Sequence, residues 1–155
     1  MTKRRSTQLF TASLTAISSA LTAAIAILFS VIFATEVTVY GFLNDMRSAV
    51  LTTVQTMTLS DGFALWYVLL FYGMPTLLSL CAAILLFSKE NGSQTKYVVG
   101  NAFALSATLV VAASSVMLTM SLNANGIEYA WLFATVFGAF CVLNIVTEII
   151  CISAN

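Results

Sequence analysis

Four long apolar stretches constrain the fold of this chain more than any other feature of its sequence. They cover about residues 10–34, 63–87, 97–122 and 129–152, and about 20 consecutive apolar residues suffice for a helix to cross a bilayer. Backbone groups in hydrocarbon must bond within a helix or a closed barrel, and the alternating pattern of a barrel is absent. The sequence therefore predicts an all-α integral membrane protein whose residues 1–155 form one domain, an antiparallel bundle of four transmembrane helices.

The overall composition agrees with a chain surrounded by lipid. Hydrophobic residues make up 60% of the sequence and charged residues 8%, far from the values of soluble domains. A secretory signal peptide is the alternative for the first apolar stretch, but that stretch is too long and lacks a clear small-x-small cleavage site. The formal net charge is zero, so no nucleic-acid partner is expected.

The distribution of basic residues predicts the orientation of the chain. The N-terminus and the loop around residues 88–96 carry five of the six Lys and Arg residues. By the positive-inside rule, both termini and this loop face the cytoplasm. The plasma membrane is favoured as the location, with an organelle membrane as the alternative.

The longest connection, residues 35–62, is expected to lie on the extracytoplasmic side and to have structure of its own. Residues 35–40 alternate as a strand would, or extend the first helix outward. From there on, Met46, Val50, Val54 and Met57 follow a helical spacing, with Asn44 or Asp45 as the N-cap. This pattern predicts a short amphipathic helix or strand on the membrane surface or on the mouth of the bundle.

Small residues recur at a helical spacing on three of the predicted spans. Such stripes let helix backbones approach closely in lipid. The stripes either pack the four helices of this bundle against one another, or form an interface with another membrane protein or with a second copy of this chain. The predicted packing interface consists of Ala12, Ala16, Ala20 and Ala24 on the first span, Gly100, Ala104 and Ala112 on the third, and Ala130, Ala134 and Gly138 on the fourth.

Ionisable side chains within or beside the spans are the candidate functional residues, because charge is costly in hydrocarbon. Glu148 lies near the end of the fourth span, one helical turn after Asn144. It is either a proton- or cation-coordinating carboxylate, or a side chain that reaches water or the basic N-terminus. Glu36, Asp61 and Glu128 lie at the outer ends of the spans and could form a weak cation-attracting ring.

Other polar features of the spans are few. Several Ser and Thr residues in the first span permit a narrow polar path: Thr11, Thr15, Ser18, Ser19 and Thr22. Asn101 should bond across helices, and Pro75 should kink the second span. The chain has no histidine and no CxxC, phosphate-loop or nucleophile motif, so we expect no enzyme activity, no cofactor and no metal site.

The layout resembles that of the claudin and PMP22-like tetraspans and, more distantly, of MARVEL-domain proteins. The likeness is one of topology: four spans, with the largest loop between the first two. Residues 35–62 contain neither the Trp nor the Cys residues of the claudin signature. The resemblance implies a non-enzymatic accessory or structural subunit, such as an auxiliary subunit of a channel, receptor or junction-type complex. The alternative is a small oligomeric channel or transporter that uses Glu148 and the outer carboxylates.

Overall fold

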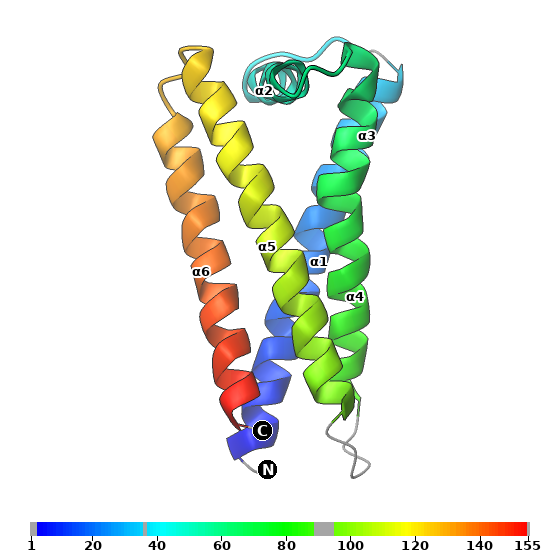
Figure 1. Ribbon diagram of the computed structural model, residues 1–155, viewed down its shortest axis with the longest axis vertical. Coiled ribbons are helices and arrows are strands. Elements are labelled where there is room, and N and C mark those ends of the chain that lie inside the picture. The colour runs from blue at the N-terminus through cyan, green and yellow to red at the C-terminus, as the bar shows by residue number, and fades with distance from the viewer. Residues whose placement is uncertain (1–2, 36, 89–94, 155) are drawn as a thin grey trace.

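The structure, a computed structural model, describes residues 3–35, 37–88 and 95–154, and helices are the only regular secondary structure within them (Figure 1). Four helical segments are long and apolar enough to cross a membrane. They are α1 (Lys3–Thr35), the continuous segment α3 (Ala64–Val68), η2 (Leu69–Gly73) and α4 (Met74–Phe87), then α5 (Thr95–Ala124) and α6 (Ala130–Ala154). The predicted four-span helical bundle is confirmed.

The four segments alternate in direction, so that sequence neighbours run antiparallel (Figure 1). The start of α1 and the end of α6 lie at the same end of the bundle, as do the end of α4 and the start of α5. We call this the terminal end. A fifth helix, α2 (Phe42–Thr56), lies across the opposite end, which we call the α2 end.

The surface of the bundle is apolar, and many of its polar side chains point inward. Large hydrophobic side chains are exposed along all four spans, whereas hydroxyl and amide side chains are buried between them. This is the reverse of a water-soluble protein and suits a surface that faces lipid. The exposed Trp66 and Trp131 both lie toward the α2 end, the position of aromatic residues at a membrane interface.

Helix α2 closes one end of the bundle through an apolar face. It begins at Phe42 after Gly41, whose φ of 63° suits glycine, and no side chain caps it. The predicted N-cap at Asn44 or Asp45 is therefore wrong, because the turn at Gly41 starts the helix earlier. Residues 37–40 form neither strand nor helix. The buried face consists of Met46, Ala49, Val50, Thr53 and Val54, while Met57 is exposed.

The irregularity expected at Pro75 takes the form of a π-helical turn, η2, just before α4. Proline has no N–H to donate to the carbonyl four residues back, and a π turn is a common way to accommodate such a break. The Thr76 hydroxyl donates to the Tyr72 carbonyl at 2.7 Å within this region. The second span therefore consists of two α-helical parts joined by one wider turn.

The interior is divided into an apolar half and a polar half. Toward the α2 end, side chains of every span pack into one hydrophobic core that includes Phe29, Val50, Tyr67 and Leu122. Toward the terminal end, buried hydroxyl and amide groups dominate, with a small apolar cluster of Ala12, Leu86 and Tyr97. Burial of polar groups is costly unless they form hydrogen bonds. The polar half is therefore the part of the interior in which we look for a functional site.

Candidate functional site

Glu148 brings a fully buried carboxyl group into the polar half of the bundle. It is 1% exposed, although its position near the end of α6 suggested that it would reach water. The Thr108 hydroxyl donates to its Oε1 atom at 3.1 Å, while Oε2 is buried with no hydrogen-bond partner among the described residues. The interpretation of Glu148 as a side chain that reaches water is therefore wrong.

The direction of α6 explains this burial. Side chains on a helix lean toward its N-terminus, and the N-terminus of α6 lies at the α2 end (Figure 1). The carboxylate of Glu148 is thus carried inward, toward Thr108 in the middle of α5, and not toward the nearer terminal end. Arg5, at the terminal end, donates instead to the carbonyls of Leu86, Phe87 and Ser88 at the end of α4.

Buried polar groups from α1, α5 and α6 form a polar layer on either side of Glu148, from Asn144 one turn before it to the contact of Asn101 with Cys151 about one turn after it. The Ser18 hydroxyl donates to Asn144 Oδ1 at 3.1 Å, which joins α1 to α6. The Asn101 amide donates to the Tyr97 carbonyl and contacts Cys151 Sγ at 3.5 Å. Asn101 Oδ1 is a second buried acceptor without a partner in the described part of the chain. Asn144, expected on the same helical face as Glu148, thus bonds Ser18 of α1, while Glu148 bonds Thr108 of α5.

A small cavity lies beside this layer. Its volume is about 20 Å³, and its polar lining comes from Ser18, Thr22, Ser79, Thr108 and Asn144. Thr108 is the hydrogen-bond partner of Glu148, and Asn144 precedes Glu148 by one turn. Such a volume holds one water molecule. The sequence pointed to Asn144 and the hydroxyls of the first span, but it did not single out Thr108 or Ser79, whose polar side chains lie on otherwise apolar helices.

Two of the three outer acidic residues, Asp61 and Glu128, lie at the α2 end, away from Glu148. Glu36 falls outside the described residues, Asp61 begins the short helical turn η1 (Asp61–Phe63), and Glu128 is exposed in the turn before α6. At the same end, the Tyr129 hydroxyl donates to the carboxylate of Asp45 on α2. Burial raises the pKa of Tyr129 to about 12, with further contributions from this hydrogen bond and the negative charge of Asp45.

The small residues predicted to pack occupy different environments. Ala12, Gly100, Ala104 and Ala130 are buried in the bundle; Ala16, Ala112 and Ala134 are half-buried; Ala20, Ala24 and Gly138 are exposed. A Cβ atom at Gly100 would lie 3.2 Å from both Leu85 Cβ and Leu86 Cγ. Gly100 therefore allows the close approach of α4 and α5.

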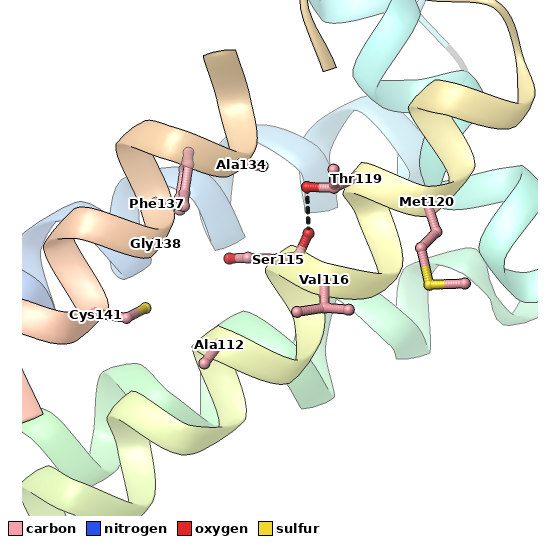
Figure 2. Close-up of a pocket in the computed structure, with 9 residues that line it drawn as sticks. All are labelled: Ala112, Ser115, Val116, Thr119, Met120, Ala134, Phe137, Gly138 and Cys141. Carbon is pink, nitrogen blue, oxygen red and sulfur yellow. Dashed lines mark hydrogen bonds between the residues drawn. The ribbon is translucent and has the colours of Figure 1, made fainter. Parts of the chain in front are cut away.

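A groove opens between α5 and α6 and continues the small-residue stripes of both helices (Figure 2). Its volume is about 230 Å³. Ala112 and Ser115 line it from α5, and Ala134, Gly138 and Cys141 from α6. A Cβ atom on Gly138 would meet nothing within 4 Å, so this side of α6 is open. The groove faces the lipid-exposed surface of the bundle.

These features define a four-span integral membrane protein with a buried carboxylate in one half of its interior and a lateral groove beside α6. No group of three or more His, Cys, Asp or Glu side chains suited to a metal ion occurs within the described residues. No protein-family model, curated protein or solved structure matches the chain.

Proposed function

We propose that this protein is a non-enzymatic accessory or structural subunit that packs beside another integral membrane protein or a second copy of itself. The likeness of its topology to claudin and PMP22-like tetraspans agrees with such a role, as an analogy of layout. Its basic residues favour cytoplasmic termini and an outer position for α2. Lipid and a neighbouring transmembrane helix are the partners this role requires.

The groove between α5 and α6 is the observation that carries this proposal. Helices associate in membranes by close packing of small residues, because lipid offers no hydrophobic drive for their association. Ala112, Ala134 and Gly138 provide small residues along the groove, and the Ser115 and Thr119 hydroxyls lie beside them. Both hydroxyls donate to carbonyls of their own helix, at 2.8 and 2.7 Å, so the groove does not demand a polar occupant.

The test is to fill the groove without disturbing the bundle. Gly138→Leu places a large side chain in open space, and Ala139→Leu adds a similar side chain at the next exposed position of α6. Each variant is purified from its native membrane in mild detergent, and the co-purifying proteins and total mass are determined. We expect Gly138→Leu to lose the partner or the second copy and Ala139→Leu to keep it.

Two results would contradict the proposal. One is purification of the unmodified protein as a lone monomer with nothing else in stoichiometric amount. The other is equal retention of the partner by both variants, which would show that the groove is not the contact surface.

A second candidate, a small oligomeric channel or transporter, is favoured by the burial of Glu148. An ionisable group within the membrane is expensive to keep and commonly marks an ion or proton pathway. Reconstitution into liposomes, with ion flux measured for the unmodified protein and for Glu148→Gln, tests this candidate. Flux that is lost on neutralisation supports transport, and absence of flux from the unmodified protein contradicts it.

A further inference from the structure

We propose that Glu148 binds one small monovalent cation of the size of sodium, in competition with a proton, in the polar layer between α1, α5 and α6. The proposal concerns binding, so it holds whether the chain acts as an accessory subunit or transports ions. It rests on the arrangement of donors and acceptors around Glu148 and on the small cavity lined by Thr108, its hydrogen-bond partner.

The polar layer has more acceptors than donors. An ionised carboxylate can accept about four hydrogen bonds, and Glu148 receives one, from Thr108. Thr108 also donates toward the Ala104 carbonyl at 2.9 Å, so it shares a single proton between two acceptors. Oε2 of Glu148 has no partner among the described residues. A positive charge beside this atom would satisfy the acceptor positions that the helices leave open.

The chemistry of the surrounding groups points to a hard, singly charged ion. The polar lining of the adjacent cavity consists of hydroxyl and amide groups from Ser18, Thr22, Ser79, Thr108 and Asn144, and such oxygens suit hard cations. One carboxylate supplies a single negative charge, which matches a monovalent ion better than a divalent one. The volume of about 20 Å³ fits one water-sized particle.

Where the side chains of neighbouring ionisable groups are described, they bond elsewhere or are thiols. On α6 they are Cys141 and Cys151, both buried thiols. On α5, Tyr97 donates to the Ser88 carbonyl, and on α1, Arg5 bonds the last carbonyls of α4. Within the described residues, therefore, the contacts of Arg5 are directed to the end of α4 and those of Glu148 to Thr108.

The lateral groove gives small apolar molecules a way toward the site. Cys141 lines both the groove and the polar cavity, so the groove reaches the wall of that cavity. A lipid-soluble carbodiimide should therefore approach Glu148 from the bilayer. Such a reagent adds to a protonated carboxyl group and rearranges to a stable N-acylurea, with the carboxyl proton retained on nitrogen. Only the protonated form reacts, so any ion that displaces the proton protects the residue.

The experiment measures labelling of the full chain by dicyclohexylcarbodiimide in mild detergent, with modification of Glu148 quantified by mass spectrometry. Labelling is followed from pH 6 to pH 9 in sodium chloride and in choline chloride at equal ionic strength, with roughly tenfold steps in sodium concentration. We expect sodium, but not choline, to reduce the labelling rate of Glu148 at least threefold at fixed pH. Glu148→Gln identifies any labelling that occurs elsewhere.

Labelling that falls with rising pH but is the same in sodium and in choline would overturn the proposal and leave a site for a proton alone. Absence of labelling at every pH in choline, where no sodium competes, would also overturn it, because the carboxyl would then not exchange protons.

Variants of the cavity test whether the proposed oxygens take part. Ser18→Ala removes a hydroxyl that lines the cavity and bonds Asn144. Ser13→Ala is the matched control, because Ser13 is exposed and bonds only the Leu9 carbonyl of its own helix. We expect Ser18→Ala to require several-fold more sodium for the same protection, while Ser13→Ala behaves as the unmodified protein. Equal protection in both variants would exclude Ser18 and the cavity from the site.

Discussion

Single side chains decide how closely the helices of this bundle approach. Gly100 shows this most directly, because a methyl group there would press on Leu85 and Leu86 at 3.2 Å. These contacts are with the β and γ carbons of neighbouring side chains, which have little freedom to move away. The smallest residue of α5 is thus placed where α4 comes nearest.

Gly100→Ala should therefore destabilise the bundle. Overpacking of this kind costs about 1–3 kcal/mol, which exceeds the gain of up to about 1 kcal/mol in helix propensity. Gly138→Ala is the control, since its new methyl group meets nothing within 4 Å, and it should be neutral or stabilising. Denaturation of both variants in detergent, followed by circular dichroism, measures the difference. Equal stability would show that α4 and α5 can move apart at no cost.

Arg5 provides a second test at the level of one residue. Its guanidinium reaches the carbonyls of Leu86, Phe87 and Ser88, which α4 leaves without intrahelical partners. Arg5→Lys keeps the charge but loses the fork of donors, so the last turn of α4 should fray and exchange its amide hydrogens faster. Arg47→Lys, at the other end, should leave that turn unchanged. Hydrogen exchange with mass spectrometry measures both, and unchanged exchange in Arg5→Lys would contradict the capping role.

The sequence identified Glu148 as the ionisable residue of interest but not its environment. Its place near the end of a span favoured contact with water, whereas the lean of helical side chains carries it toward the middle of the bundle. The partner Thr108 lies on another helix, forty residues away in sequence. Contact between Glu148 and Thr108 depends on how α5 and α6 are rotated about their own axes. The packing of all four spans sets these rotations, and a single sequence does not specify them.

At the level of whole elements, the four spans were predictable because hydrophobic length is a local property of the sequence. The start of α2 was not, because Asn44 and Asp45 are good capping residues and the backbone turn at Gly41 takes precedence over them. The π turn η2 was likewise hidden. Proline indicates a break in hydrogen bonding, but how the chain closes that break depends on its neighbours.

Helix α2 should be held in place in a pH-dependent way. Its Asp45 accepts the hydroxyl of Tyr129, and burial, with that bond and the charge of Asp45, raises the pKa of Tyr129 from 10.0 to about 12. The folded state thus favours the protonated phenol, so the contribution of this contact is complete below pH 10 and is lost as the pH rises through about 12.

The measurement is fluorescence anisotropy of a probe at Ser48→Cys, an exposed position on α2, in a Cys81→Ser background. We expect the probe to gain mobility between pH 10 and pH 12. In Tyr129→Phe it should be more mobile at neutral pH, without the added transition. If the unmodified Tyr129 protein and Tyr129→Phe showed the same transition in probe mobility, that transition would belong to another titrating group.

For the molecule as a whole, the orientation in the membrane is the property that the charges predict. The start of α1 and the end of α6 lie together at the terminal end of the bundle (Figure 1), and by the charges of the sequence this end should face the cytoplasm. In a Cys81→Ser background, a membrane-impermeant maleimide applied to intact cells should label Asn125→Cys at the α2 end. It should label Ser6→Cys at the terminal end only after permeabilisation, and the opposite pattern would reverse the orientation.

The π turn of the second span has a consequence for how this chain tolerates changes of length. A π turn closes its hydrogen bond over one more residue than an α turn, so it absorbs one extra residue with little change in the rotation of the helix beyond it. Removal of one residue from Leu69–Gly73 should therefore restore regular α-helix and leave Ser79, Ala82 and Leu86 buried as they are now. Insertion of one residue into α4 before Ser79 would instead rotate the rest of α4 by about 100° and turn these side chains toward lipid. The second span can thus be shortened at its π turn but not lengthened beyond it.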